Sequence, residues 1–400
     1  MEIPTQRSSL LRGVAALPRT VWLLAAISLV NDAASDMIYP LVPIYLASVL
    51  MAGPKALGLI EGIAEAVSSV IKLFAGVLAD RTGKTRAWVI AGYAIAGIAR
   101  PLIGLAQTWP GVLACRFADR VGKGLRSAPR DALINLSIAP SQRGLAFGFH
   151  RAMDNLGAVI GPLTAGALLA AGVGLRNVFL LAAIPALVVL VLAFAVREPE
   201  LPPAPAKEPF RWTFAGLPPE FRRYLVVLAL FTLGNSSNMF LLLRANALGA
   251  SPTRVTLMWA LFSFVAAVLS TPLSALSDRL GRERVLAGAW LAYGVVYLAI
   301  GLLPEADWAL WAAFATYGAV TAALEGTEKA LVADLVPRER GGTAFGWYNL
   351  VAGVFLLPAS LVFGWIWSTI SPFAAFAFGS ACAIVAALLL RLWVMPRGVD

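Results

Sequence analysis

The amino-acid sequence predicts an all-α membrane protein with twelve transmembrane helices in two pseudo-symmetric six-helix bundles. Hydrophobic residues make up 59% of the 400 positions and charged residues only 14%, against roughly 25% charged residues in soluble proteins. Uncharged stretches such as 178–196 and 373–390 are long enough to cross a bilayer as helices. In addition, short segments recur at one fixed offset, and this repetition predicts the two halves.

Twelve candidate spans follow one another along the chain. Their boundaries are placed where apolar runs give way to charged residues, prolines and glycines. The spans cover residues 20–47, 56–79, 87–106, 110–135, 144–171, 175–196, 221–246, 252–276, 285–303, 307–335, 341–369 and 372–393.

Alternate loops between these spans are rich in arginine and lysine. Arg7 and Arg19 precede the first span, and Arg397 follows the last. Basic loops and ends stay on the cytoplasmic side of a membrane. We therefore expect a multi-pass protein of the bacterial inner membrane with both termini in the cytoplasm.

A proline-rich hydrophilic segment, residues 197–220, divides the chain near its middle. It predicts a cytoplasmic linker between an N-terminal bundle (1–196) and a C-terminal bundle (221–400). Internal repetition supports this division, because Asp80-Arg81-Thr82-Gly83 recurs as Asp278-Arg279-Leu280-Gly281, at an offset of 198 residues. Ala146-Phe147-Gly148 recurs as Ala344-Phe345-Gly346 at the same offset. Parallel repeats of this kind occur in secondary transporters.

The loop after the second span reads Gly76-Val-Leu-Ala-Asp80-Arg81-Thr-Gly83-Lys84-Thr-Arg86. It resembles the signature loop of the major facilitator superfamily, G-x-x-x-D-R-x-G-[RK]-x-[RK]. A second copy, with Ser in place of the first Gly, contains Asp278, Arg279 and Gly281. A small residue permits close helix approach, and a glycine permits a tight turn. The resemblance implies a twelve-helix transporter in which this loop acts as a conformational switch.

Two further segments resemble the drug:proton antiporter branch of that superfamily. The first span contains Ser35-Asp36-Met37-Ile38-Tyr39-Pro40-Leu41-Val42-Pro43, similar to [ST]-D-M-x-x-P-x-x-P. The fifth contains Gly157-x-x-x-Gly161-Pro162-x-x-Ala165-Gly166, similar to G-x-x-x-G-P-x-x-G-G with Ala in one Gly position. The resemblance implies a proton-coupled exporter of a small organic molecule. The alternative interpretation of the second segment is helix packing alone, since small residues at this spacing let helices approach closely.

The fourth span carries several cations. The branch has the pattern R-x-x-x-G here, and either Arg116 or Arg120 can be aligned with its arginine; we favour Arg116. The additional cations, Lys123 and Arg126, depart from the pattern of the branch. They leave open an alternative function, the transport of an anionic metabolite or of a metal ion, including import.

Charged residues inside spans are costly to bury and commonly mark a transport pathway. Asp32 and Asp36 lie one turn apart in the first span, and Glu61 and Glu65 lie one turn apart in the second. We expect these carboxylates to couple protons to the substrate. Asp36 is the first candidate because it lies one turn before Pro40, near the middle of the span. The alternative is that cations of the fourth span pair permanently with these acids and only hold helices together.

Other polar side chains of the spans are expected to line a central cavity. This group comprises Asn31, Arg116, Arg120, Lys123, Asn235, Asn238, Glu325 and Glu328. Asp154 in the fifth span is expected to pair with Lys123 or Arg126.

Several other classes of function are disfavoured. The net charge of +10 is distributed between apolar segments, so no basic domain for nucleic acid is expected. We find no H-E-x-x-H, P-loop or dinucleotide fingerprint, which argues against an enzyme and against a bound cofactor. One His, one Met and the distant Cys115 are too few for a metal site. The expected partners are the lipid bilayer, protons and a small-molecule substrate, and the expected state is a monomer.

Overall fold

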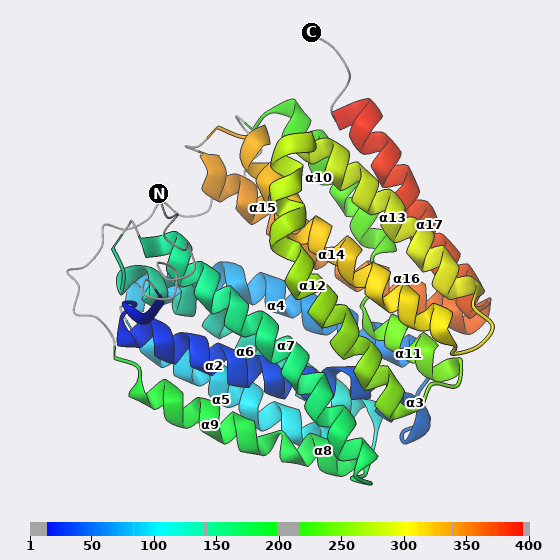
Figure 1. The fold of residues 1–400 in the computed structure, drawn as a ribbon, viewed down its shortest axis with the longest axis horizontal. Coiled ribbons are helices and arrows are strands. Elements are labelled where there is room, and N and C mark those ends of the chain that lie inside the picture. The colour runs from blue at the N-terminus through cyan, green and yellow to red at the C-terminus, as the bar shows by residue number, and fades with distance from the viewer. Residues whose placement is uncertain (1–13, 83, 140–141, 198–216, 338–339, 395–400) are drawn as a thin grey trace, which may run out of the picture.

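The computed structural model describes residues 14–82, 84–139, 142–197, 217–337 and 340–394, and within these ranges the regular structure is entirely helical (Figure 1). The all-α prediction is therefore confirmed for the described residues. The first half contains α2 (Arg19–Ile38), α3 (Val42–Ser48), α4 (Pro54–Thr82), α5 (Thr85–Leu102), α6 (Trp109–Leu136), α7 (Arg143–Ala170), α8 (Leu175–Leu181) and α9 (Ala183–Ala195).

The second half contains α10 (Pro219–Gly234), α11 (Met239–Ala247), α12 (Pro252–Leu280), α13 (Arg282–Leu302), α14 (Trp308–Leu335), α15 (Gly341–Val354), α16 (Leu356–Thr369) and α17 (Pro372–Leu389). A short turn of π-helix, Leu390–Val394, extends α17.

Prolines explain three of the helix interruptions. A proline has no N–H to donate to the carbonyl four residues earlier, and its ring crowds that carbonyl. Pro40 lies in the 3₁₀ turn Tyr39–Leu41 that separates α2 from α3, so the backbone carbonyl of Asp36 loses its α-helical partner. Pro185 follows the junction of α8 and α9, and Pro358 follows that of α15 and α16. The bend after α2 therefore places Asp36 at the end of a helical segment.

Nine helical segments in the described residues are long and apolar enough to cross a membrane, and they establish a multi-pass membrane protein. Three other long helices, α4, α6 and α14, are not among these nine. They carry much of the intramembrane charge named above, including Glu61, Arg116 and Glu328.

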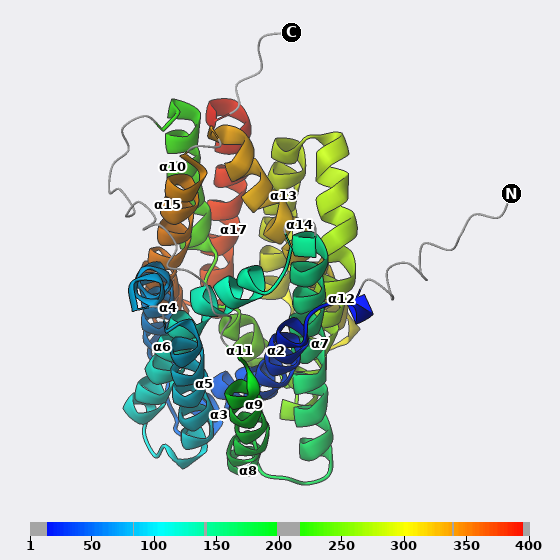
Figure 2. The same ribbon diagram turned by 90° about the vertical axis from the view of Figure 1, so that its left-hand side faces the viewer.

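Figure 1 shows α2 to α9 grouped in the lower part of the view and α10 to α17 in the upper part. The two groups lie closest at the right, around α3 and α11, and diverge toward the left. Helix α4 packs on α16, and α7 packs on α12, so each group is bound to the other by two long helices. Figure 2 shows the same two groups from the side.

Glycines mark where the two groups approach most closely. A Cβ atom at Gly58 of α4 would lie 2.3 Å from the backbone oxygen of Ser360 in α16, and one at Gly364 would lie 2.6 Å from the oxygen of Pro54. Such distances leave room only for hydrogen at these positions. The tightest approaches to backbone atoms lie at the beginning of α4, and Gly353 of α15 also lies close against the side chain of Ser69, midway along α4.

The signature loop is only partly described. Gly76 lies within α4, Gly83 and the side chains of Asp80 and Arg81 lie outside the described residues, and Lys84 is exposed just before α5. In the second copy Gly281 has a φ of 94°, a conformation that favours glycine. Arg282 follows it and binds Asp278 at 3.1 Å and Asp334 of α14 at 2.7 Å.

Candidate functional site

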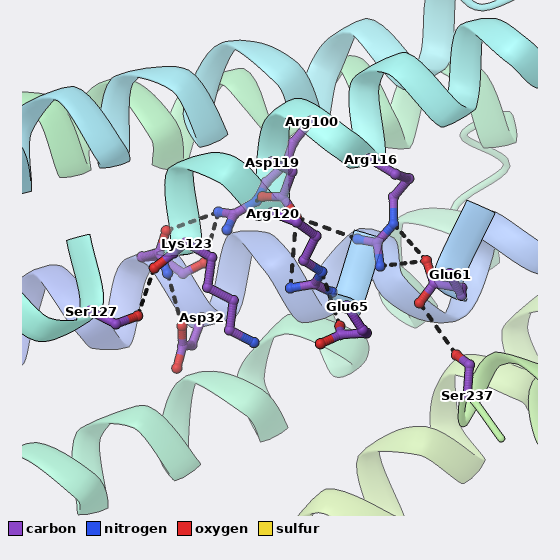
Figure 3. A network of polar contacts seen from close by, with 11 residues as sticks. Asp32, Glu61, Glu65, Arg100, Arg116, Asp119, Arg120, Lys123, Ser127 and Ser237 are labelled. Atoms are coloured by element: carbon purple, nitrogen blue, oxygen red, sulfur yellow. Dashed lines mark hydrogen bonds and ion pairs between the residues drawn. The ribbon is translucent and has the colours of Figure 1, made fainter. Parts of the chain in front are cut away.

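A network of buried charges joins α4, α5 and α6 in the first half (Figure 3). Arg116 donates from Nε and Nη2 to one oxygen of Glu61, at 2.8 and 2.7 Å. Asp119 accepts from Arg100 at 2.9 Å and lies 3.4 Å from Arg116. Arg116, Asp119 and Glu61 are each only 1% exposed. Because charges this deeply buried need partners, the network fixes the three helices relative to one another.

Glu65 and Lys123 continue the network toward less buried surroundings. Arg120 lies 3.1 Å from Glu65, whose side chain is 29% exposed. Lys123 is half-buried and has Glu65, Lys72 and Asp32 as electrostatic neighbours. It forms no ion pair with any residue that the structure describes. Its ammonium group is therefore available to a ligand or to a rearranged partner.

Asp32 and Asp36 differ from Glu61 and Glu65 in having no arginine partner among the described residues. Asp32 accepts from Asn31 Nδ2 at 2.8 Å. Asp36 accepts from the indole Nε1 of Trp259 at 3.1 Å. Trp259 belongs to α12, so this hydrogen bond joins the first half to the second. The ring of Trp259 also stacks on Tyr39, with centroids 5.1 Å apart.

Further polar contacts between described residues cross from one half to the other. Ser237, in the interruption between α10 and α11, donates to Glu61 at 3.3 Å (Figure 3). Arg151 of α7 forms an ion pair with Glu325 of α14. Two of the carboxylates predicted from the sequence, Glu61 and Glu325, thus lie at the interface between the halves.

The second half contains a pocket of about 250 Å³ that includes Asn235, Asn238, Glu325 and Glu328 in its wall. Glu328 accepts from Trp290 Nε1 at 3.3 Å and from the Tyr348 hydroxyl at 2.7 Å. The structure therefore brings together all four cavity residues that were predicted in this half. It places Asn31, Arg116 and Arg120 in the buried network of the first half.

Asp154 does not pair with Lys123 or Arg126, so that sequence-based expectation is wrong. Its carboxylate lies 3.5 Å from the ring of His150, one turn earlier in α7. The other ring nitrogen of His150 lies 2.9 Å from the hydroxyl of Ser28 in α2. The guanidinium of Arg126 lies over the ring of Tyr93 instead, 4.7 Å from its centroid.

The glycine-rich segment of the fifth span lies where α7 packs on α2. A Cβ atom at Gly157 would lie 2.4 Å from the oxygen of Leu29, and one at Gly161 would lie 2.4 Å from the oxygen of Ala33. Pro162 lies inside α7. Gly166 faces α12, where a Cβ atom would meet Thr256 Oγ1 at 3.1 Å. The segment thus presses α7 against the helix that carries Asp32 and Asp36.

Sequence reasoning missed several residues of this site. Arg100 was overlooked because it lies near the end of the third span, although an arginine in an apolar run was a usable signal. Trp259 and Ser237 gave no signal, because a tryptophan or serine in an apolar span is commonplace. Their importance comes from partners in the other half of the chain.

The family model described as Major Facilitator Superfamily matches residues 24–244 and again residues 224–399. The chain belongs to the major facilitator superfamily. It is therefore a membrane transporter of a small-molecule substrate and not an enzyme.

Relatives of this superfamily member include both transporters of archaea and drug-resistance proteins of bacteria. An MFS-type transporter of Methanocaldococcus jannaschii is 34% identical over 381 residues, which cover 94% of each chain. The multidrug resistance protein MdtG of Escherichia coli is 30% identical over 285 residues, which cover 67% of this chain and 68% of MdtG. A crystal structure of a POT family transporter has a TM-score of 0.77 at 14% identity, with 94% and 98% of the two chains covered. This last likeness shows the fold.

Proposed function

We propose that the chain is a proton-coupled exporter of a small organic molecule that works by alternating access. In this proposal twelve spans form two six-helix bundles, residues 1–196 and 221–400, joined by a cytoplasmic linker at 197–220. The protein is a monomer of the bacterial inner membrane with both termini in the cytoplasm. The two successive matches of the family model support the repeated halves, and the arginine-rich loops support the orientation.

The direction in which the site opens follows from this orientation. The glycine contacts between α4 and α16 lie at the beginning of α4, which is the end away from the cytoplasm. The halves diverge toward the opposite end, where α2 and α15 begin (Figure 1). In this proposal the halves are packed together at the outer end and stand further apart at the cytoplasmic end, where an exporter takes up its substrate.

The hydrogen bond between Asp36 and Trp259 carries the proposal. It joins α2 to α12 at 3.1 Å, and Asp36 has no cationic partner among the described residues. An indole N–H can only donate, and a charged acceptor makes such a bond roughly twice as strong as a neutral one. Protonation of Asp36 therefore weakens a direct bond between the halves. A proton taken up from outside would thus shift the equilibrium between the arrangement in which this bond is made and the one in which it is broken.

Transport into proteoliposomes tests the proposal. Ethidium accumulation is measured in vesicles with an acidic interior and in vesicles without a pH gradient. We expect the gradient to drive accumulation by the unaltered protein, and we expect Asp36→Asn to abolish the gradient dependence. Asp131→Asn is the matched control, because Asp131 lies in α6 with its side chain 51% exposed. Equal accumulation with and without the gradient would remove proton coupling, and coupled transport by Asp36→Asn would remove Asp36 from the mechanism.

The similarity to MdtG supports a drug-like organic molecule as the substrate. A second candidate function, transport of an anionic metabolite, is favoured by Lys123 and its neighbour Lys72. Uptake of a labelled dicarboxylate into the same vesicles separates the two. If the unaltered protein takes up the dicarboxylate but not ethidium, and Lys123→Gln loses the dicarboxylate uptake, the second function replaces the first.

A further inference from the structure

The pocket in the second half differs from a plain apolar cavity, because its polar groups are held in fixed directions by neighbouring side chains. It lies among α10, α13, α14 and the α15–α16 pair. Its wall includes Phe231, Asn235, Asn238, Tyr293, Tyr317 and Glu328.

Glu328 supplies a negative group whose position is fixed. One carboxylate oxygen accepts from Trp290 in α13 and the other from Tyr348 in α15. Both donors are neutral, and within the described ranges Glu328 forms no ion pair. Each oxygen has a second acceptor position, so the carboxylate can still accept an N–H from a ligand. A protonated amine is the group that best compensates a charge held out of water.

Asn235 and Asn238 supply hydrogen-bond donors. Tyr293 donates to Oδ1 of Asn235 at 3.2 Å, and Tyr317 donates to Oδ1 of Asn238 at 2.7 Å. Each amide oxygen already accepts one hydrogen bond, which orients the amide and leaves its NH₂ group as the donor. Neither amide nitrogen has a hydrogen-bond partner in the part of the chain that the structure describes. The pocket therefore offers N–H donors to hydroxyl or carbonyl oxygens of a ligand.

The aromatic rings of the pocket are packed on one another. Phe231 stacks on Trp290 with centroids 4.6 Å apart, and Tyr293 stacks on Tyr297 at 4.2 Å. Tyr317 stacks on Phe262 at 5.3 Å. One face of each lining ring is thus covered by a neighbour. Each of these rings therefore presents at most one face to a ligand, and the groups with a fixed hydrogen-bond direction are Glu328 and the two asparagines.

We propose that this pocket binds a hydroxylated amine: a protonated primary or secondary amine at Glu328, with hydroxyl or carbonyl oxygens of the same molecule at Asn235 and Asn238. If the proposed transport function holds, this ligand is also the transported substrate, and only that identification rests on the proposed function. Binding itself requires no proton gradient. Ethidium, the probe of the transport experiment, has aryl amines that can donate to Glu328 but no hydroxyl groups, so it is expected to bind this pocket more weakly than a hydroxylated amine.

Thermal unfolding of the purified full chain in detergent, at neutral pH, tests the ligand class. Glucosamine carries an amine and hydroxyls, glucose lacks the amine, and cyclohexylamine lacks the hydroxyls. We expect Tm to rise with glucosamine, and we expect half-saturation at a concentration about tenfold or more below that of either control compound. Glucose loses the hydrogen bond to the charged Glu328, and cyclohexylamine loses several hydrogen bonds to neutral groups. Equal responses to the three compounds, or no response to glucosamine at its highest soluble concentration, would overturn the proposal.

Variants locate the binding. Glu328→Gln is expected to weaken glucosamine binding about tenfold or more, while Asn235→Ala weakens it several-fold and leaves cyclohexylamine binding unchanged. Glu305→Gln, in the exposed loop after α13, is the matched control and keeps the affinity of the unaltered protein. The Tm of each variant without ligand reports whether it is folded, and the two pocket variants test the site independently. Undiminished affinity in both would place the ligand elsewhere. These outcomes leave gradient-driven transport to be judged separately by the Asp36 experiment.

Discussion

The two halves of this transporter bury polar groups in different ways. In the first half Arg100, Arg116 and Asp119 meet as full charges, almost completely out of water. In the second half the hydrogen-bond donors that Glu328 meets among the described residues are the neutral groups of Trp290 and Tyr348. Breaking a buried ion pair leaves a charge without compensation, whereas loss of one neutral donor leaves a smaller defect. The first half is therefore held together by buried ion pairs, whereas the second half holds its buried acid by hydrogen bonds from neutral donors.

The largest expected effect tests the rigidity of the first half. Arg116→Met removes the only arginine that donates to Glu61 within the described residues, and it leaves that carboxylate buried. We expect a loss of about 3–5 kcal/mol in stability, measured as a fall in unfolding temperature in detergent. Arg176→Met is the control, because Arg176 is exposed on α8. A comparably small change in both variants would show that the network contributes little.

Each half contains close glycine contacts between its own helices, and substitutions there are expected to have a smaller effect on stability. Gly161→Ala places a methyl group 2.4 Å from the oxygen of Ala33, and Gly318→Ala places one 2.6 Å from the oxygen of Phe262. Each should cost roughly 1–3 kcal/mol, since a packed backbone has to move. Gly148→Ala in α7 has no atom within 4 Å of the new methyl group and serves as the control. If only Gly161→Ala is destabilising, the greater rigidity of the first half extends to its helix packing.

The smallest effect on stability is expected in the second half. Glu328→Gln keeps an oxygen for one donor but turns an N–H toward the other, so we expect a loss of about 1 kcal/mol. The loss of stability in Glu328→Gln is compared with that in Glu61→Gln of the first half by the same unfolding measurement. A loss for Glu328→Gln as large as for Glu61→Gln would contradict the comparison of the two halves.

The sequence predicted much of the fold because membrane-spanning helices have a direct signature. Runs of apolar residues of the required length indicated the all-α architecture, and the second copy of the loop motif marked the turn at Gly281, which has a positive φ. The motif also indicated the superfamily. Helices α4, α6 and α14 were harder to recognise by hydropathy, because their apolar faces are interrupted by charges.

The candidate site was only partly predictable. Asp36 and Glu328 could be found because an acid in an apolar span is conspicuous. Their partners Trp259 and Trp290 could not, since each lies in a different helix and tryptophans are common in such spans. Asp154 has His150 one turn away in the same helix, a neighbour that the spacing alone gives, and only the positions of α6 and α7 show that Lys123 and Arg126 are not its partners.

The sequence by itself determined the membrane environment, the helical character and the superfamily, because hydropathy and short motifs act locally along the chain. The tertiary structure alone decided which carboxylates are bound to arginines and which are bound to neutral donors. Helix packing brings together residues as distant in sequence as Asp36 and Trp259. Charges interact strongly in surroundings of low polarity, so a neighbouring arginine keeps a buried acid ionised, whereas an acid beside a neutral donor can exchange its proton.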